Sequence, residues 1–236
     1  MSTKTLKTAV LISGRGSNLQ ALIDACASTL FPAKIVLVIS NVAGAAGLER
    51  AERAGIPAKV IAHGGFATRE AFDEAIEAAL SEAGAEFVCL AGFMRILSDG
   101  FVRRWEGKIV NIHPSLLPSF KGLNVHEQTI AAGVRVSGCT VHYVVPELDS
   151  GPIIAQAAVP VFPDDTPATL AERVLAIEHR TYPLALKLVA EGGVALENGR
   201  AAFVKPSTRP PVVPGTLGRT RPAFIKPSFS PRSRDR

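Results

Sequence analysis

Residues 8–27 read TAVLISGRGSNLQALIDACA and contain an apolar run, a glycine-containing turn and an amphipathic segment. The run Thr8–Ile12 has the length and composition of a buried β-strand. After the turn Ser13–Asn18, apolar residues recur at the spacing of one helical face, namely Leu19, Leu22, Ile23 and Cys26. This pattern predicts a strand, a loop and a helix that covers Leu19–Ala27.

The same order of elements recurs farther along the chain. Strands are expected at Lys34–Ser40, Ala58–Ile61 and Phe87–Ala91, and helices at Gly47–Ala54 and Thr68–Ala83. Such alternation predicts an α/β fold, in which a mostly parallel central sheet carries helices on both faces. Ligands of these sheets bind at the carboxyl ends of the strands.

The pattern changes in the second half of the chain. A short strand is expected at Lys108–Ile112, and Pro114 prevents regular pairing from continuing past His113. Further elements are expected in the order helix Val125–Ala132, strand Ser137–Val145, strand Ile153–Val161, helix Pro167–Ala190 and strand Ala201–Val204. They predict a later, hairpin-like antiparallel addition to the sheet, a long covering helix and a last edge strand.

The net charge of +5 is unevenly distributed. Residues 205–236 contain eight Lys or Arg and one acidic residue, whereas residues 1–204 carry a net charge of −2. The basic segment is rich in Pro, Arg and Ser and lacks helical or strand periodicity. We therefore expect a folded domain at residues 1–204 and a disordered tail at residues 205–236, without a specific role in nucleic-acid binding.

The composition also indicates the cellular compartment of the protein. No apolar run approaches the ~20 residues that span a bilayer, and Ala9–Ile12 is too short for the core of a signal peptide. Cys26, Cys89 and Cys139 are widely spaced and odd in number, so neither a disulfide framework nor a metal clip is indicated. We expect a cytoplasmic protein with no metal and no membrane partner.

An amide and an imidazole stand together where the strand at residues 108–112 ends. Asn111 and His113 are two residues apart, so they project to the same side of a strand. Asn can donate to an oxygen that becomes negative, His exchanges protons near neutral pH, and Asp149 is a candidate carboxylate partner. The pattern indicates acyl-group chemistry. Each residue also has a structural interpretation, in which Asn caps a turn, His makes a structural hydrogen bond and Asp serves the turn before Gly151.

The loop Gly16–Asn18 can bind a phosphate through its backbone N–H groups and the start of the following helix. It is not the dinucleotide-binding fingerprint, because Leu19 stands where GxGxxG requires its last glycine. The alternative is a tight connection whose helix is capped by Ser17 or Asn18. The expected position on the same rim as His113 favours phosphate binding.

Taken together, these motifs resemble those of the phosphoribosylglycinamide formyltransferases, folate-dependent enzymes of purine synthesis. The matching residues run in order over about residues 7–204: Ser13 and Gly14, Gly16–Gln20, Ala91–Leu97, Asn111–Pro118, Glu147–Pro152, and Glu178 with His179. The sequence departs from commoner patterns at Lys121, where some members have proline, and at Arg15. A solvent-facing side chain is the alternative interpretation of Lys121.

The resemblance implies a Rossmann-like formyltransferase fold and transfer of the formyl group of 10-formyltetrahydrofolate, a co-substrate, to the glycinamide amine of a ribonucleotide. It implies that Asn111, His113 and Asp149 are catalytic and that the ribonucleotide binds Gly16, Ser17, Asn18 and Glu178. It also implies folate binding by Arg69, Met94, Arg95, Ile96, Leu97, Asn111, Val145, Pro146, Glu147, Leu148 and Asp149. The alternatives are a solvated arginine at Arg69 and plain core packing of Met94, Ile96 and Leu97.

Other functions share part of this pattern. Methionyl-tRNA formyltransferase and formyltetrahydrofolate hydrolase use the same Asn-x-His and Asp groups, but the first normally adds a C-terminal domain and the second an N-terminal one. Neither domain is expected here, because the folded region begins at the first strand and ends near Val204. An alternative of another class is a non-catalytic nucleotide-binding module. Small-molecule substrates are expected, and both a monomer and a homodimer stay open.

Overall fold

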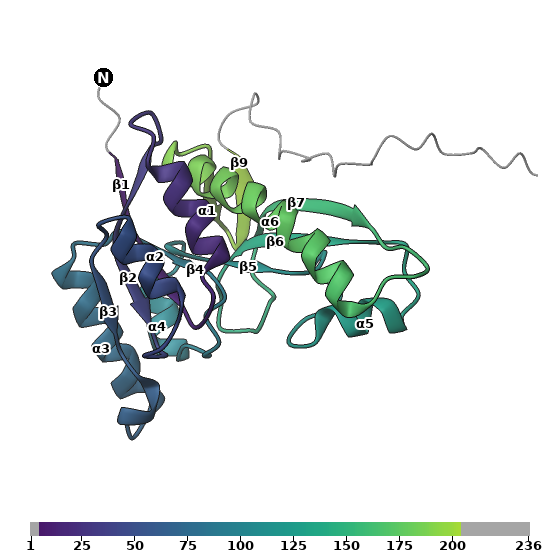
Figure 1. The fold of residues 1–236 in the computed structure, drawn as a ribbon. Coiled ribbons are helices and arrows are strands. Elements are labelled where there is room, and N and C mark those ends of the chain that lie inside the picture. The colour runs from purple at the N-terminus through teal and green to yellow at the C-terminus, as the bar shows by residue number, and fades with distance from the viewer. Residues whose placement is uncertain (1–4, 204–236) are drawn as a thin grey trace, which may run out of the picture.

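The computed structural model describes residues 5–203, so Val204 and the expected tail at residues 205–236 lie outside the described part. Seven strands form the main sheet: β1 Leu6–Ile12, β2 Ala33–Ser40, β3 Ala58–Val60, β4 Phe87–Leu90, β5 Ile109–His113, β6 Val136–Tyr143 and β7 Ile153–Pro160. Their order is β3-β2-β1-β4-β5-β6-β7, and the pairs β5–β6 and β6–β7 are antiparallel, whereas the other four pairs are parallel. The mostly parallel sheet with a later antiparallel addition is therefore confirmed (Figure 1).

Helices cover both faces of this sheet. They are α1 Ser17–Cys26, α2 Gly47–Arg53, the 3-10 turn η1 His63–Gly65, α3 Arg69–Glu82, α4 Asp99–Arg104, α5 Val125–Ala131 and α6 Pro167–Ala190. Side chains of α1 and α6 pack with Val10 and Ile12 of β1, whereas α3 and α4 pack with Ala9 and Leu11. Successive residues of β1 therefore enter opposite apolar layers, which explains why the part Ala9–Ile12 of this strand is apolar throughout.

Helix α4 was not predicted, because its six residues are too few to show a helical period. Tertiary contacts hold it in place. The Ser98 hydroxyl accepts the Phe101 N–H at 3.3 Å, and the buried carboxylate of Asp73 on α3 accepts the Ser98 N–H at 2.6 Å. Arg104 and Glu77 form a further ion pair between the two helices, at 2.6 Å. These contacts fix the end of the segment that follows β4.

Strand β1 lies where the order of strands reverses. The chain proceeds from β1 to β2 and β3 on one side and then returns to β4 on the other. The loops that leave β1 and β4 therefore diverge and open a crevice beyond their carboxyl ends. Tyr182 of α6 supports the adjacent strands, because its buried hydroxyl lies 2.9 Å from the Leu90 carbonyl and 3.2 Å from that of Val110.

The C-terminal strand does not extend the main sheet. β8 Val194–Glu197 and β9 Arg200–Phe203 form a separate two-stranded hairpin, so the expectation of an edge strand at residues 201–204 was wrong. Asn198 and Gly199 form its turn with φ of 49° and 71°, and this Asn-Gly pair is a hairpin signal that the sequence offered. Within residues 5–203, no helix has the length and hydropathy that crossing a membrane requires.

Candidate active site

Four strand ends meet at one rim of the sheet. Ser13, after β1, donates its hydroxyl to Asn41 Oδ1 at 2.6 Å and accepts the N–H of Met94, after β4, at 2.7 Å. Asn41, after β2, has its Nδ2 3.3 Å from Nδ1 of His63, after β3. The carboxyl ends of parallel strands therefore bring distant segments together, as the fold class predicts.

Gly16 makes the turn into α1. Its φ is 69°, and an added Cβ would lie only 2.6 Å from the Cα of Gly47, so the position requires glycine. No side chain of the described residues caps α1, so the interpretation of Ser17 or Asn18 as the cap was wrong. The first N–H groups of α1 are therefore available to an anion at the helix N-terminus.

Asn18 instead connects α1 to α6. Its Nδ2 donates to Glu178 Oε2 at 2.7 Å, and both side chains are buried. Burial raises the pKa of Glu178 to about 7, although the hydrogen bond from Asn18 opposes this shift. The structure thus brings two of the expected ribonucleotide-binding residues into direct contact, 160 positions apart in the chain.

Replacement of Glu178 by glutamine is expected to stabilise the protein at alkaline pH. The pKa of Glu178 is raised from 4.5 to about 7, so folding favours the protonated carboxyl, and this stability is lost as pH rises from about 4.5 through 7. Glutamine resembles the protonated form and can still accept from Asn18. Above pH 8 the free energy of unfolding should rise by up to about 3 kcal/mol.

Urea unfolding at pH 4 and at pH 8 measures this effect. Glu178→Gln and the wild-type protein should differ little at pH 4 and clearly at pH 8. The exposed Glu82 provides the control, because Glu82→Gln should leave this pH dependence unchanged. Equal free energies of unfolding of Glu178→Gln and wild type at both pH values would contradict the expected loss of stability when Glu178 ionises.

A cavity of about 360 Å³ lies beside the start of α1, lined by Ser17, Gln20, Ala21, Asp24, Arg50 and His179. Arg50 donates from Nε to the Arg15 carbonyl at 2.9 Å and from Nη1 to Gln20 Oε1 at 3.2 Å. Burial lowers the pKa of His179, and the charge of Arg50 lowers it further. A guanidinium and a helix N-terminus therefore share one cavity, which suits an anion.

Asn111 and His142 lie opposite each other on β5 and β6. Asn111 Nδ2 is 3.4 Å from His142 Nε2, and His142 Nδ1 is 2.9 Å from the Tyr143 carbonyl. Because a carbonyl only accepts, the proton of a neutral His142 sits on Nδ1, and Nε2 accepts from the amide. Burial lowers the pKa of His142, which favours this neutral ring. Among the described residues the Asn111 amide has no second acceptor, so one of its N–H groups remains for a ligand.

His113 and Asp149 form a buried pair next to this amide. His113 Nε2 donates to the Phe120 carbonyl at 2.8 Å, and His113 Nδ1 lies 3.4 Å from Asp149 Oδ2. The other carboxylate oxygen, Asp149 Oδ1, lies 3.8 Å from His142 Nε2. The structure therefore gathers Asn111, His113 and Asp149 around His142. A proton on His113 Nδ1 would lie next to the carboxylate of Asp149.

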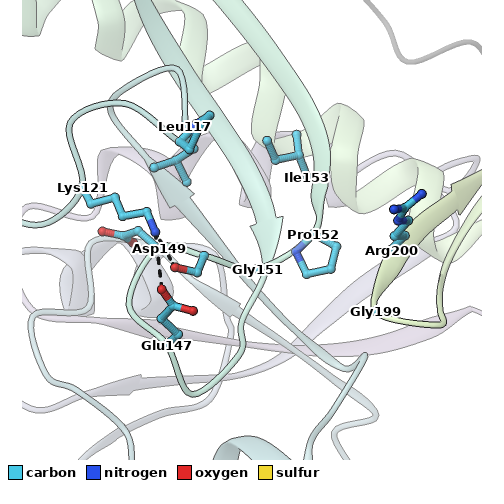
Figure 2. A pocket seen from close by; sticks show the side chains of 11 residues that line it. Leu117, Lys121, Glu147, Asp149, Gly151, Pro152, Ile153, Gly199 and Arg200 are labelled. Atoms are coloured by element: carbon cyan, nitrogen blue, oxygen red, sulfur yellow. Dashed lines mark hydrogen bonds and ion pairs between the residues drawn. The ribbon is translucent and has the colours of Figure 1, made fainter.

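The loop that carries Asp149 is held from a neighbouring segment. Asp149 has a φ of 48°, which is uncommon for a residue other than glycine, and its Oδ2 also accepts the Gly122 N–H at 2.9 Å. Lys121 donates to Ser150 Oγ at 2.5 Å and lies 3.8 Å from Glu147, so it is not merely solvent-facing. Figure 2 shows Lys121, Glu147 and Asp149 at one end of a cavity of about 480 Å³ and Arg200 at the other.

The segment after β4 contains both exposed and buried residues. Met94 and Ile96 are 71% and 58% exposed, whereas Leu97 is buried in the cluster that contains Phe72. Core packing was the alternative interpretation of Met94, Ile96 and Leu97. It is correct for Leu97 alone. The guanidinium of Arg95 lies 5.6 Å from the centre of the Phe72 ring, and its Nε has no hydrogen-bond partner within residues 5–203.

The other residues expected to contact folate are mostly exposed. Arg69 is the first residue of α3, and its exposed side chain forms no hydrogen bond or ion pair with another described residue. In the loop before Asp149, Val145 is half-buried, whereas Pro146, Glu147 and Leu148 are exposed. With Met94 and Ile96, this loop provides apolar surface that a flat ligand could cover.

Residues 6–186 match the formyl transferase family. The chain belongs to that family. This formyl transferase is 46% identical over 195 residues to the phosphoribosylglycinamide formyltransferase of Haemophilus influenzae, a match that covers 83% of this chain and 92% of that protein. The similarity therefore extends over nearly the whole of that relative.

Larger relatives contain this unit as one part. The formyl transferase is 59% identical over 202 residues to the bovine trifunctional purine biosynthetic protein adenosine-3, and the chain spans only 20% of that protein. It also superimposes on the crystal structure of phosphoribosylglycinamide formyltransferase from Anaplasma phagocytophilum with a TM-score of 0.79 and 50% identity. That alignment covers 86% of this chain and 96% of the other. The Rossmann-like formyltransferase fold is thereby confirmed.

Two polar residues of this formyl transferase site were not predicted from the sequence. His142 was missed because its position opposite Asn111 depends on the register of β5 and β6, which the sequence does not state. Arg50 was missed because it belongs to α2 and reaches the Ser17 cavity only after folding. A histidine inside the expected strand Ser137–Val145 was the available signal for His142.

Proposed function

We propose that this formyl transferase moves the formyl group of 10-formyltetrahydrofolate to the amine of N1-(5-phosphoribosyl)glycinamide. The products would be formylglycinamide ribonucleotide and tetrahydrofolate, in de novo purine synthesis. The observation that carries the proposal is the buried His113–Asp149 pair, 3.4 Å apart, beside an Asn111 amide that is oriented by His142. The names of the bacterial and animal relatives support the same substrates.

Asn111 and His113 have the role of stabilising negative charge. The amine nitrogen attacks the formyl carbon, a new C–N bond forms, and the formyl oxygen becomes negative. The remaining N–H of Asn111 and a proton on His113 Nδ1 donate to this oxygen. Each donor of this kind typically stabilises the transition state by about 3 kcal/mol.

Asp149 has the role of a general base for the attacking amine. Its carboxylate lies 3.4 Å from His113 Nδ1 and accepts the proton that the attacking amine loses. The bond between the formyl carbon and N10 of the folate then breaks, and N10 takes up a proton. This sequence of steps requires neither a metal nor a covalent intermediate on the protein.

The ribonucleotide is proposed to lie between the Gly16–Asn18 loop and this catalytic group. Its phosphate would bind the first N–H groups of α1, with Ser17 and Arg50 beside it, and its ribose would meet Glu178. The folate would cover the exposed side chains of Met94 and Ile96 and the loop that ends at Asp149. The exposed apolar side chains fit a flat aromatic ring.

Removal of the Arg50 charge is expected to weaken ribonucleotide binding. Arg50→Met should raise KM for the ribonucleotide by roughly 10-fold and leave kcat within about twofold, because the phosphate does not react. Arg53 provides a matched control, since it lies on the same helix but its side chain bonds, within residues 5–203, only to the Glu49 carbonyl. Steady-state kinetics test this, and a similar rise of KM in Arg53→Met would refute a specific role for Arg50.

We further propose that the activity resides in residues 1–204, in the cytoplasm, with small-molecule substrates and no membrane or nucleic-acid partner. The family match, which covers residues 6–186, lies entirely within residues 1–204. The cavity of about 360 Å³ at Ser17 can hold a phosphate group. This size favours a small phosphorylated acceptor over tRNA.

The proposed function is tested by offering alternative acceptors to the purified full chain. With 10-formyltetrahydrofolate present, the glycinamide ribonucleotide should be formylated, and initiator tRNA should not. Formylation of the tRNA would instead select methionyl-tRNA formyltransferase, and release of formate without an acceptor would select the hydrolase. Absence of all three reactions in folded protein would favour a nucleotide-binding module.

A further inference from the structure

The segment Phe120–Gly122 contacts both proposed catalytic side chains through its backbone. The Phe120 carbonyl accepts from His113 Nε2 at 2.8 Å, and the Gly122 N–H donates to Asp149 Oδ2 at 2.9 Å. Phe120 and Gly122 have φ of 55° and 80°, so the chain bends sharply on both sides of Lys121. This bend directs one acceptor to the imidazole and one donor to the carboxylate.

Lys121 joins this segment to the loop that carries Asp149. Its Nζ donates to Ser150 Oγ at 2.5 Å, and the same hydroxyl donates to the Leu148 carbonyl at 2.9 Å. The Ser150 hydroxyl is therefore engaged both as acceptor and as donor. Glu147 lies 3.8 Å from Nζ, but its side chain is 79% exposed, so this ion pair contributes little. The bond to Ser150 is the principal contact.

The Asp149 loop requires external support. Asp149 adopts a left-handed backbone, a conformation that persists in a non-glycine residue only when its surroundings enforce it. On its C-terminal side, Gly151 packs so closely that an added Cβ would lie 1.7 Å from the Tyr143 carbonyl. The loop is therefore fixed at Gly151 by packing and at Ser150 by Lys121, and Asp149 precedes both anchors.

We propose that Lys121 is a positioning residue that holds the Asp149 carboxylate against His113 by binding Ser150; this inference rests on the proposed function. Lys121 does not touch the reacting atoms in this role. Loss of its ammonium group would let the loop relax from the left-handed conformation and move the carboxylate away from Nδ1. A small displacement of a catalytic group lowers the reaction rate without unfolding the protein.

The role is tested first with Lys121→Met, which keeps the length of the side chain and removes its charge and donors. At saturating folate, kcat should fall roughly 10-fold, with KM for the ribonucleotide and the thermal midpoint nearly unchanged. Lys121→Arg should recover part of the loss, because arginine can also donate to Ser150. Lys187→Met on the exposed side of α6 is the matched control and should behave as wild type.

A double-mutant cycle with Ser150→Ala tests whether Lys121 acts through Ser150. Each single variant should lose roughly 10-fold in kcat, and the double variant should lose about the same amount, not 100-fold. If Lys121→Met is unstable, Ser150→Ala alone decides, since it keeps the lysine and removes the contact. An unchanged kcat in Ser150→Ala, or additive losses, would overturn the inference. An inactive wild-type chain would instead refute the proposed function.

Discussion

Asp149→Asn is expected to lower kcat for formyl transfer by ~10²–10⁴ with little change in folding. Asparagine has the size of aspartate, and its Oδ1 can still accept the Gly122 N–H that Asp149 Oδ2 accepts at 2.9 Å. It lacks the negative charge that faces His113 Nδ1 and the basic oxygen that accepts the amine proton. Loss of both functions should affect the chemical step more than substrate binding.

Initial rates at saturating substrates, together with thermal unfolding, measure this effect. Asp164 is the control, because it is an exposed aspartate close to the start of α6, and Asp164→Asn should keep wild-type turnover. His113→Ala should show a loss of the same order as Asp149→Asn, since the two residues form one pair. Turnover within about threefold of wild type in both variants would remove their proposed catalytic roles.

Asn111→Ala is expected to lower kcat by ~10²–10³, the cost of deleting one donor to a developing oxyanion. The substitution removes the amide that His142 orients at 3.4 Å and leaves the rest of β5 unchanged. KM for the ribonucleotide should change little, because the phosphate loop lies after a different strand. A second variant, Asn111→Asp, should be at least as slow, because it keeps the shape but places a negative charge next to the oxyanion.

Steady-state kinetics separate this role from simple folate binding. A donor that acts in the transition state lowers kcat, whereas a donor that binds ground state and transition state equally raises KM alone. A raised KM for folate with an unchanged kcat would therefore contradict the oxyanion role of Asn111. Thermal unfolding of each variant is the accompanying control for loss of structure.

The centre of the sheet was predictable because its central strands β1 and β4 are buried on both faces. Residues Ala9–Ile12 of β1 and the whole of β4 are continuous apolar runs, and such runs are strong signals of buried strands. The order of the elements then placed Ser13, Met94 and Asn111 at one rim. The hydrogen bonds that link Ser13 to Asn41 and Met94 bear out that placement for Ser13 and Met94, and the parallel pairing of Leu90 with Asn111 bears it out for Asn111.

Features that depend on register and loop geometry were not predictable. His142 meets Asn111 only because β6 pairs with β5 in one particular register. The bonds from Gly122 to Asp149 and from Lys121 to Ser150 span more than 25 positions and depend on left-handed residues that follow no period. Asn18 resembled a helix cap but bonds to Glu178, because α6 lies beside α1. Tertiary structure decided each of these cases.

The fate of a labelled formyl group tests the central claim most directly. In a single turnover with carbon-13 in the formyl group of 10-formyltetrahydrofolate, the wild-type protein should transfer the label to the glycinamide nitrogen of the ribonucleotide. Asp149→Asn should make the same product at least ~100-fold more slowly. Label that appears as formate or on initiator tRNA, with none on the ribonucleotide, would contradict the account.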